Sequence, residues 1–465
     1  MKSNIFWRGD LSSRLLALLL YGLPLAAHAQ FSYSTNSNGT ITIVKYGGTS
    51  GAVTVPSSYN NRTVASIGPT AFMGNSTVSS IALPAGVTNI GYYAFSFCSH
   101  LTAITVDSHN TFFSSLGGAL FDKGQTTLIA FPNALAGSYS VPGTVLSIAN
   151  EAFAGSLNLT GVTIPPGTTN IGFFAFQSCS ALKAITVPAN NAFYSSLDGV
   201  LFDKRQVILE AFPGAWGGNY TLPASVQYVQ PFTLNNCRGL TNILVDAQSV
   251  AFSGTSGVLF DRAQTTLIQY PGGKPGSFVI PNGVTSIAIE AFADCTNLAG
   301  IIIPGSVINI GTQAFLSCLG LTTVTIPVGV TSIGDAAFED CAFMTSAYFT
   351  GDAPPQNPDV FQGEVLTVYY LPGTAGWGST YDGFPAVLWN PAIQTTDGAF
   401  GFHDNSFGFN VTGNSNLTFV VEAATNLVNP VWVPVSTNTL VGGAFQFHDP
   451  EPDNFSGRFY QLSFP

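Results

Sequence analysis

A short phrase that recurs at two fixed spacings constrains this chain more than any other feature of its sequence. The phrase is Ile-Gly-x-x-Ala-Phe with variants, and successive copies begin 23 or 58 residues apart. The longer spacing is the shorter one plus a constant 35 residues. Periods of this size are typical of repeat proteins, in which stacked units bury apolar faces that no unit buries alone. The eight copies start at Ile67, Ile90, Ile148, Ile171, Val229, Ile287, Ile310 and Ile333.

Each short unit predicts one strand and one irregular turn. In the unit that starts at Ile310, the stretch Leu321-x-x-Val324-x-Ile326 alternates as a strand does, and Pro327 follows it. Proline ends the strand because it cannot donate to a ladder. The remaining apolar residues never sustain a helical stripe. We therefore expect an all-β repeat solenoid of about twelve rungs between residues 53 and 349.

Three insertions of 35 residues account for the longer spacing. They share the phrase Gly-Val-Leu-Phe-Asp, with Ala for Val in the first copy, and it starts at Gly118, Gly199 and Gly257. Each insertion continues through a polar turn into a second apolar run, a pattern that predicts a β-hairpin. We expect three hairpins, each followed by a short strand that rejoins the solenoid.

The repeat resembles the BspA-type leucine-rich repeats of bacterial surface proteins. The pattern Ile-Gly-x-x-Ala-Phe-x-x-Cys-x-x-Leu of that family is matched almost letter for letter in five of the units, whereas the unit at Val229 has Pro231-Phe232-Thr233-Leu234 instead of x-x-Ala-Phe. The resemblance covers roughly residues 50–350. It implies a secreted or cell-surface solenoid that serves adhesion or protein binding.

Domain boundaries follow from where the repeat stops. Residues 30–350 are expected to form the solenoid and residues 351–392 a C-terminal cap or linker, because an open end exposes a sheet edge and the core. Residues 393–465 alternate differently, as in Phe407-x-Phe409-x-Val411. They predict a small β-sandwich that resembles C-terminal modules of secreted bacterial repeat proteins, and we expect it to fold independently.

The N-terminus predicts export. Three basic residues precede an apolar run from Leu15 to Leu25, and Ala27-His28-Ala29 follows as a cleavage site. This order is that of a secretory signal peptide. We expect residues 1–29 to be removed after Ala29, leaving a secreted, extracellular or cell-surface protein whose mature chain does not insert into a membrane.

Charged residues are scarce, at 8% of the chain, and the net charge is −11 with only 13 Lys plus Arg. A chain without a basic stripe cannot neutralise nucleic-acid phosphates or dock electrostatically on anionic lipid. The expected partner is therefore an extracellular protein or polysaccharide, and the chain is expected to be a monomer.

The six cysteines share one position, eight residues after the start of their unit. An even count in a secreted protein often indicates disulfides. However, equivalent side chains in a stack point the same way, whereas a disulfide needs converging Cβ atoms. We therefore expect buried thiols in one core ladder. These residues are Cys98, Cys179, Cys237, Cys295, Cys318 and Cys341.

Motifs for catalysis are absent from the sequence. It contains no Gly-x-Ser-x-Gly, His-Glu-x-x-His, Cys-x-x-Cys or phosphate loop. Two Phe-His-Asp triplets, around His403 and His448, leave a His/Asp metal site open, and capping of strands at turns explains them equally. We expect no enzyme activity, and hence no catalytic residue, no cofactor and no metal.

The candidate binding surface is the row of rung positions that face solvent between the last two apolar residues of each strand. Along the stack this row offers neither a carboxylate pair for glycoside hydrolysis nor an aromatic row for stacking sugars. It forms a flat face of small residues with a mild apolar spot at Leu244 and Ile302. The candidate residues are Thr105, Thr163, Thr186, Leu244, Ile302 and Thr325.

Aromatic pairs that follow Ile-Gly mark the units leading into an insertion. They are Tyr92-Tyr93 and Phe173-Phe174, with Pro231-Phe232 in the third such unit. A lone hairpin is marginal in water, so we expect these rings to clamp the hairpins, and the alternative is an exposed aromatic binding patch. The matching rings of the insertions are Phe112-Phe113, Phe193-Tyr194 and Phe252.

The sequence as a whole predicts an extracellular binding or adhesion protein without catalysis. A structural protein of the envelope that uses the solenoid as a spacer is the alternative. A carbohydrate-active subunit, with a site in the hairpins or the C-terminal part, is less favoured.

Overall fold

The computed structural model describes residues 30–464 except 358, 404–405, 416 and 450–456, so the expected signal peptide lies outside the described residues. The described residues form strands and turns and contain no helix. The chain divides into two compact units. The N-terminal unit runs through Gly217 and includes Ser225–Gly239, and the C-terminal unit consists of Gly218–Ala224 and Leu240–Pro465. The expected all-β solenoid is confirmed.

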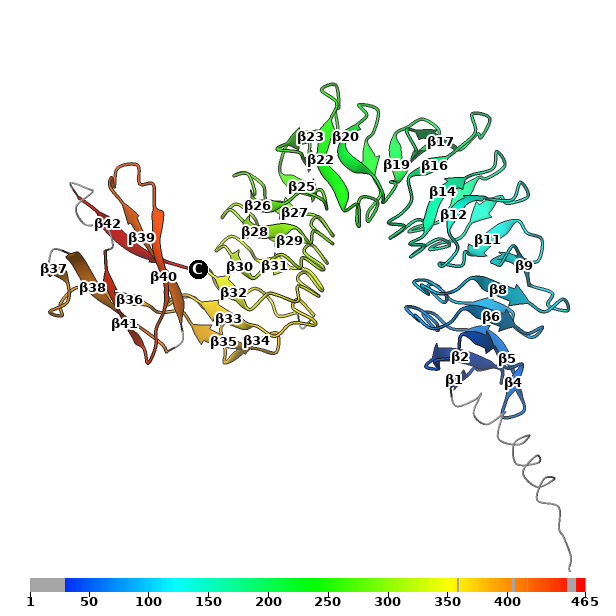
Figure 1. Cartoon of the computed structure of the whole chain (residues 1–465), viewed down its shortest axis with the longest axis horizontal. Helices are drawn as coiled ribbons and strands as arrows, with labels where there is room; N and C mark the ends of the chain where they lie inside the picture. Colours follow the sequence, from blue (N-terminus) through cyan, green and yellow to red (C-terminus); the bar gives the residue numbers. More distant parts are fainter. Residues whose placement is uncertain (1–29, 358, 404–405, 416, 450–456, 465) are drawn as a thin grey trace, which may run out of the picture. The chain divides into compact units, whose positions relative to one another are not determined.

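The first row of strands comes from the Leu-x-x-Val-x-Ile stretches, one strand for each turn of the solenoid (Figure 1). Alternation sends every second side chain into the core. The row is divided into five separate sheets, and within each sheet its neighbours pair in parallel, as Ile81 does with Ile104. In the described chain this row comprises fourteen strands: β3 (Ala52–Thr54), β6 (Ser80–Leu83), β8 (Ala103–Val106), β12 (Gly137–Ser140), β14 (Leu159–Thr163), β16 (Ala184–Thr186), β20 (Gly217–Leu222), β22 (Gly239–Val245), β26 (Gly276–Val279), β28 (Leu298–Ile302), β30 (Thr323–Ile326), β32 (Ser346–Phe349), β33 (Thr367–Tyr370) and β35 (Phe384–Leu388). Twelve of them, β3 to β32, are the rungs expected from the sequence.

The second row of strands contains the start of each Ile-Gly phrase. These strands are short and pair in parallel within four groups, as Ile148 does with Ile171, and each later group begins with a strand that also pairs with a hairpin. The row comprises β5 (Arg62–Ile67), β7 (Asn89–Ile90), β11 (Thr127–Ala130), β13 (Ser147–Ile148), β15 (Asn170–Ile171), β19 (Ile208–Ala211), β21 (Tyr228–Val229), β25 (Thr266–Gln269), β27 (Ser286–Ile287), β29 (Asn309–Ile310) and β31 (Ser332–Ile333).

Each insertion supplies a complete solenoid turn in addition to the expected hairpin. In the first insertion, β11 pairs antiparallel with the hairpin and in parallel with β13, and β12 then rejoins the first row beside β14. A spacing of 58 residues therefore contains two turns and one hairpin. The hairpins are β9 (Phe113–Leu116) with β10 (Ala119–Asp122), β17 (Tyr194–Leu197) with β18 (Val200–Asp203), and β23 (Phe252–Thr255) with β24 (Val258–Asp261).

A buried asparagine anchors each of the first two hairpins to the solenoid. The amide of Asn191 donates to the carbonyl oxygens of Pro165 and Thr168 at 3.1 and 3.0 Å. Its Oδ1 accepts from the backbone N–H groups of Phe193 and Tyr194, both at 2.8 Å. Asn110 makes the equivalent bonds in the first insertion. The anchor is thus polar and satisfied, which a buried amide requires.

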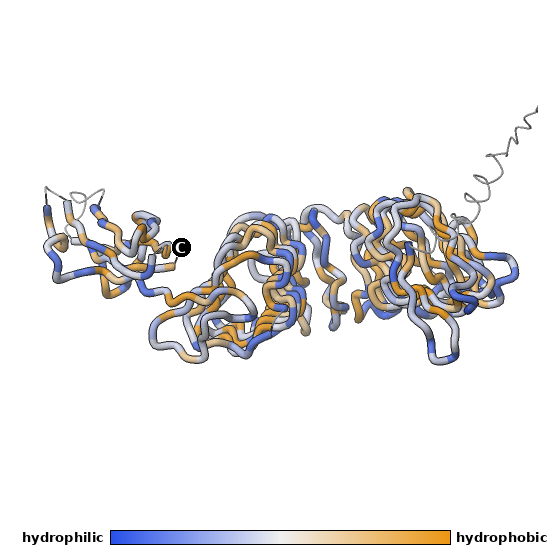
Figure 2. Tube along the Cα trace, turned by 90° about the horizontal axis from the view of Figure 1, so that it is seen from below, coloured by the Kyte–Doolittle hydropathy of each residue, from blue (hydrophilic) through white to orange (hydrophobic). Residues whose placement is uncertain are grey.

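Stacked phenylalanines form the core of the turns. In the C-terminal unit, Phe315 lies 4.7 Å from Phe292 and 4.9 Å from Phe338 between ring centroids, with interplanar angles of 12° and 2°. The insertion turns join this ladder, since Tyr270 stacks on Phe292 and, in the N-terminal unit, Phe131 contacts Phe153. The recurrence of apolar residues in successive turns is visible in Figure 2.

The cysteines form a second ladder beside the phenylalanines, and the prediction of buried thiols is confirmed. All six are buried and none is in a disulfide. The Cys98 thiol donates to the carbonyl oxygen of Phe72 at 3.0 Å, and Cys318 donates to that of Phe292 at 3.1 Å. Burial raises the pKa of Cys98 to about 11. The thiols of Cys98, Cys179, Cys318 and Cys341 each satisfy a carbonyl of the preceding turn in this way.

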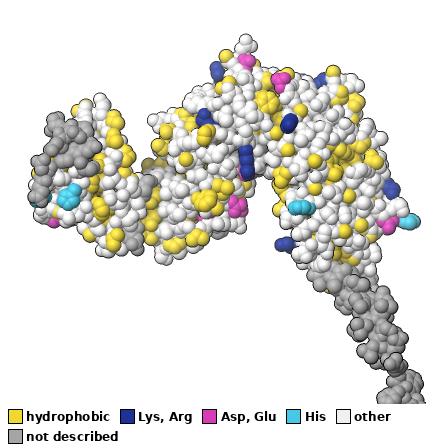
Figure 3. Space-filling model, viewed as in Figure 1, with side chains coloured by type: hydrophobic (Ala, Val, Ile, Leu, Met, Phe, Trp, Pro, Cys, Tyr) yellow, Lys and Arg dark blue, Asp and Glu magenta, His cyan; other side chains and the backbone are white. Residues whose placement is uncertain are grey.

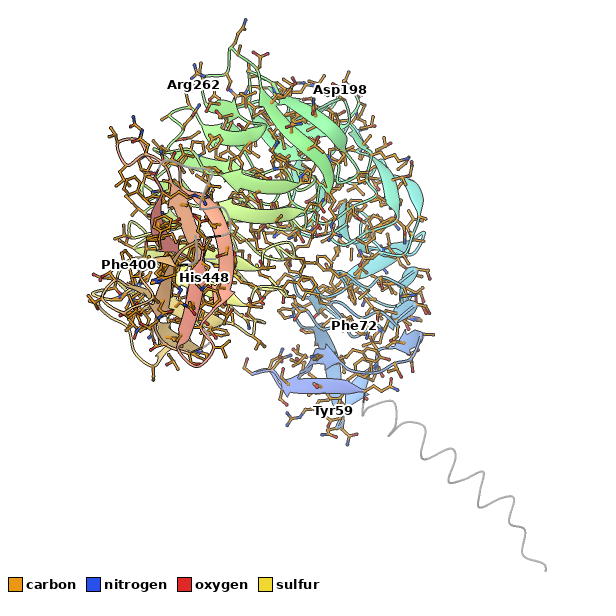
Figure 4. The ribbon with its side chains drawn as sticks, turned by 60° about the vertical axis from the view of Figure 1, so that its left-hand side comes forward. Tyr59, Phe72, Asp198, Arg262, Phe400 and His448 are labelled. Carbon is orange, nitrogen blue, oxygen red and sulfur yellow. The ribbon has the colours of Figure 1, made fainter. Side chains whose placement is uncertain are left out.

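An antiparallel pair covers the N-terminal end of the stack. It consists of β1 (Phe31–Thr35) and β2 (Ile41–Tyr46), and β2 continues the second row by pairing with β5, which β4 (Ser58–Tyr59) also joins. Tyr46 stacks on Phe72 and so begins the aromatic ladder. Figure 4 shows Phe72 inside these turns and Tyr59 at their N-terminal end.

Past residue 350 the solenoid continues instead of ending in an irregular cap. Within the C-terminal unit, β33 pairs in parallel with β32 and β35 with β33, while β34 (Thr380–Tyr381) closes against β35. Phe361 extends the aromatic ladder. The assignment of residues 351–392 as a separate segment stays a prediction.

Two antiparallel sheets follow. One contains β36 (Ala392–Gln394), β37 (Gly401–His403), β38 (Ser406–Thr412) and β41 (Ala444–His448), and the other β39 (Thr418–Ala424), β40 (Val433–Thr439) and β42 (Phe459–Ser463). Their core includes Tyr348 and Trp389 of the last turns, and Phe464 contacts both rings. This shared core argues against the expected independent folding of residues 393–465, and the sandwich domain itself stays a prediction.

Candidate functional site

The six candidate residues of the sequence all lie on first-row strands. Thr105, Thr163 and Thr186 lie in the N-terminal unit, and Leu244, Ile302 and Thr325 in the C-terminal unit. Thr163 and Thr186 are direct partners on β14 and β16. All are exposed except Thr325, which is partly buried.

The apolar spot on this row includes a residue that the sequence analysis missed. Val279 pairs directly with Ile302, and their side chains are 59% and 60% exposed. Val279 lies on the strand with which an insertion rejoins the first row, so it falls outside the regular Ile-Gly units. The Ile280-Pro281 that follows it, like Ile303-Pro304 after Ile302, is the signal that identifies it.

Farther along, the same row is already covered within the C-terminal unit. Thr325 pairs with Tyr348, and Tyr348 with Tyr369. Tyr348 is buried against Phe464 of the C-terminal sheets. The outward face of the first row thus accepts an apolar partner at one end.

A cavity of about 280 Å³ opens where the second insertion shortens a turn of the N-terminal unit. Between their second-row and first-row strands, the regular turn has residues 172–183 and the insertion turn only residues 212–216. The shorter turn leaves a gap between its two neighbours, which we call notch 2. Notch 2 is lined by residues 171–179, by Glu210, Ala211, Phe212 and Gly214, and by Tyr228, Gln230–Thr233, Asn235 and Asn236.

Aromatic rings close notch 2 from both sides. Phe174 meets Phe232 edge to face at 4.6 Å, and the Asn236 amide donates to Ser178 Oγ at 3.0 Å. These contacts join turns 58 residues apart, so the predicted ring clamp between Phe174 and the hairpin is wrong. Aromatic pairs occur in the units that lead into an insertion because their rings span the gap that the short turn leaves. Phe173 is 64% exposed, and Tyr228 is half exposed.

The polar groups of notch 2 come from β19 and the neighbouring turns. The Gln230 amide donates to Glu210 Oε2 at 3.2 Å. Burial raises the pKa of the Glu210 carboxyl, Asp203 raises it further, and the Gln230 amide offsets part of the rise. The notch therefore offers amides, hydroxyls and one carboxyl beside exposed rings.

The first insertion forms an equivalent cavity of about 220 Å³, notch 1, in the same unit. Tyr92 is 63% exposed, and Tyr93 donates from its hydroxyl to Gln177 Oε1 at 2.9 Å. Burial raises the pKa of Glu151, whose Oε2 accepts from the Tyr93 N–H at 3.0 Å. Ile129–Phe131 form its floor, as Glu210–Phe212 do in notch 2.

The left-handed turn in these units is imposed by the repeat and not by the rings. Tyr93 and Phe174 have φ of 53° and 58°, and Thr70 and Gln313 at the same position of regular turns have 55° and 53°. Large side chains seldom adopt such a φ. Because Tyr93 and Phe174 nevertheless keep the same positive φ, the packing of the repeat fixes the backbone of the turn, and this backbone determines where the rings lie.

The described lining residues limit the chemistry that each notch can support. Each notch has one carboxyl among its described lining residues, whereas glycoside hydrolysis needs two that flank the bond. No group of three or more His, Cys, Asp or Glu suited to a metal ion occurs among the described residues. Charged side chains are also sparse on the face shown in Figure 3.

The structure gives the second Phe-His-Asp triplet a structural role. Asp449 accepts two bonds from Arg458 Nη1, at 2.7 and 2.9 Å, and one from the Tyr460 hydroxyl. His448 lies on the C-terminal sheets (Figure 4). Asp404 of the first triplet lies outside the described residues.

These features define the class of the molecule, a β-solenoid repeat protein whose irregular turns carry its surface chemistry. The family model described as a BspA-type leucine-rich repeat region matches residues 53–198 and 274–375, which is more than half of the chain. The chain belongs to the BspA-type leucine-rich repeat family. The resemblance stated from the sequence is thereby confirmed.

Solved structures of bacterial leucine-rich-repeat proteins are also similar to the chain. A leucine-rich cell surface protein from Faecalibacterium prausnitzii is 22% identical over 75% of this chain and 94% of its own, with a TM-score of 0.35. The pneumococcal vaccine antigen PcpA is 19% identical over 73% and 87%, with a TM-score of 0.34. With TM-scores this low, the similarities do not indicate what the chain binds. No curated protein matches the chain. None of the described segments is a helix long and apolar enough to cross a membrane.

Proposed function

We propose that this chain is an extracellular recognition protein that binds a protein or polymer through its solenoid and does no chemistry on it. The observation that carries the proposal is the recurrence of an open, aromatic-edged cavity at two successive insertions. Exposed rings held by a rigid scaffold are typical of binding surfaces, because loops positioned in this way lose little entropy on binding.

Export supports this function. A signal peptide cleaved after Ala29 places the mature chain outside the cytoplasm, either released or on the cell surface. The low charge and scarce basic residues favour neutral or apolar partners over nucleic acid. Membership of a family of surface repeats is consistent with recognition.

A capture screen tests the proposal. The mature chain is immobilised and offered soluble polysaccharides and purified surface proteins, and bound material is eluted and its mass measured. We expect saturable binding of at least one ligand, recovered unchanged. Absence of saturable binding favours the spacer alternative, and recovery of a cleaved or modified ligand contradicts the absence of catalysis.

A second binding mode, docking of a partner protein, is favoured by the exposed pair Val279–Ile302. Their row continues to Tyr348, which an apolar segment of the same chain already covers. We expect the occupant to be an apolar strand or loop of another protein. Ile302→Asp should then abolish capture of that protein, whereas Phe343→Asp, at an exposed position of the same unit outside the first row, should leave it unchanged.

A further inference from the structure

We infer that notch 1 and notch 2 are two sites for one neutral carbohydrate chain, which binds with a sugar unit against each exposed ring. The inference rests on the proposed binding function and adds to it the class of ligand, the residues that hold it and the number of sites.

The composition of the notches selects against charged ligands. Of the described residues that line either cavity, none is Lys, Arg or His, so an anion finds no counter-charge. The carboxyls of Glu210 and Glu151 have raised pKa values because they are partly buried. Because burial disfavours the ionised form, these carboxyls attract a cation less strongly than an exposed carboxylate does.

The same groups suit hydroxyls. A sugar hydroxyl donates and accepts, and in notch 2 the Glu210 carboxyl accepts while the amides of Gln230 and Asn236 do both. The apolar face of a sugar ring carries C–H bonds, whose positive ends are attracted to the negative face of an aromatic ring. Phe173 in notch 2 and Tyr92 in notch 1 are the rings exposed for this contact.

The size of the notches is also consistent with binding a short part of a polysaccharide. At about 280 and 220 Å³ they lie at or just below the small end of ordinary ligand cavities, which start near 300 Å³. A site of this size holds a short part of a ligand and leaves the rest to run along the surface. A polymer meets this condition, whereas an isolated small molecule gains little from so open a site.

The spacing of the notches favours a polymer with a regular repeat. Between the short turns at Phe131 and Phe212 lie the turns of Phe153 and Phe176, and the hairpin strand β18 pairs with β19 on the edge opposite β21. At 4.7–4.9 Å per strand, three to four such steps put the notches roughly 14–20 Å apart. Both lie in the N-terminal unit, on the same side of the second row. A chain that occupies one notch is therefore held close to the other, which raises its apparent affinity.

Affinity electrophoresis of the mature chain tests the inference. Native gels contain dextran, mannan, laminarin or xyloglucan as neutral polysaccharides, or heparin as a polyanion. We expect at least one neutral polysaccharide to retard the protein and heparin to have no effect. Because no ion pair is involved, the apparent Kd should change less than about twofold between roughly 50 and 500 mM NaCl.

Variants locate the sites. Tyr92→Ala and Phe173→Ala should each weaken binding about fivefold to tenfold, and the double variant about a hundredfold, because the second contact is intramolecular. Matched controls are Phe112→Ala and Phe193→Ala, which remove equally large rings, 51% exposed, from the hairpins outside the notches. The controls should bind as the parent does, and circular dichroism and Tm should not change in any of the four.

Three results overturn the inference. If no neutral polysaccharide binds but a protein ligand does, and Phe173→Ala weakens it, the notches bind protein and only the ligand class is wrong. If a polysaccharide binds and the notch variants match their controls, the site is elsewhere and the recognition function stands. If heparin binds and salt abolishes binding, the ligand is an anion and the argument from charge fails.

Discussion

The aromatic ladder makes a sharp prediction about what holds the turns together. Phe315 is fully buried and stacks on Phe292 and Phe338 at the distances given above. Phe→Ala in a core costs about 3–5 kcal/mol, and each aromatic pair contributes about 0.5–1.5 kcal/mol beyond burial. Because Phe315 has two stacking partners, Phe315→Ala should fall at the upper end, about 4–5 kcal/mol.

Two further variants separate burial from stacking. Phe315→Leu keeps most of the apolar area and loses both stacked pairs, so it should cost about 1–3 kcal/mol. Phe343→Ala removes a ring that is 63% exposed in the same unit, and should change stability by no more than about 0.5 kcal/mol.

Urea denaturation gives the changes in free energy of unfolding, and hydrogen exchange locates them. Solenoid turns contact mainly their neighbours, so loss of protection should centre on the turns of Phe292, Phe315 and Phe338. If Phe315→Ala costs as little as Phe343→Ala, or if the protection lost is spread evenly over the unit, the ladder is not the stabilising element that we describe.

Three other properties follow from the structure. All six thiols should resist maleimide in the native protein and react after unfolding, as measured by intact mass, because they are buried; rapid native labelling of Cys318 would contradict the ladder. Asn191→Ala should expose the second hairpin to protease, since it removes the four bonds of the anchor, while Asn190→Ala at the exposed neighbour should not. Burial and the nearby Asp294 raise the pKa of Glu290 to about 8, so the folded chain binds more protons than the unfolded chain between about pH 4.5 and 8, and Tm should fall as pH rises through this window. Glu290→Gln should remove most of that dependence, and an unchanged slope would place the titration elsewhere.

The regular part of the fold could be predicted because its signal repeats. Alternation in Leu321-x-x-Val324-x-Ile326 places the first-row strands, and the shared position of the cysteines shows that they stack instead of pairing. The hairpins were likewise evident from a phrase that occurs three times.

The notches could not be predicted, because they arise from a turn that is shorter than its neighbours. In sequence, Phe212-Pro213 marks only the end of a strand, and its position in a short turn that lines a cavity follows only from the structure. Glu210 gave no signal at all, since the first and third insertions have Ile129 and Ile268 at that position. Aromatic pairs do occur in the units that lead into an insertion, as the sequence indicates. The ring that contacts Phe174, however, is Phe232 of the next regular turn and not a ring of the hairpin.

The two spacings have a consequence for how such a chain can change length. Because 23 and 58 residues are one turn and two turns plus a hairpin, duplication or deletion of either block keeps every remaining strand in register. Apart from the contacts that bridge the short turns, such as Phe174–Phe232, contacts are mainly between adjacent turns. Recombination within the gene can therefore vary the number of blocks without a new core. Removing a 23-residue block shortens the stack by about 4.8 Å. Adding a 58-residue block like either of the first two adds a notch, so the valency of the molecule is inherited as a copy number.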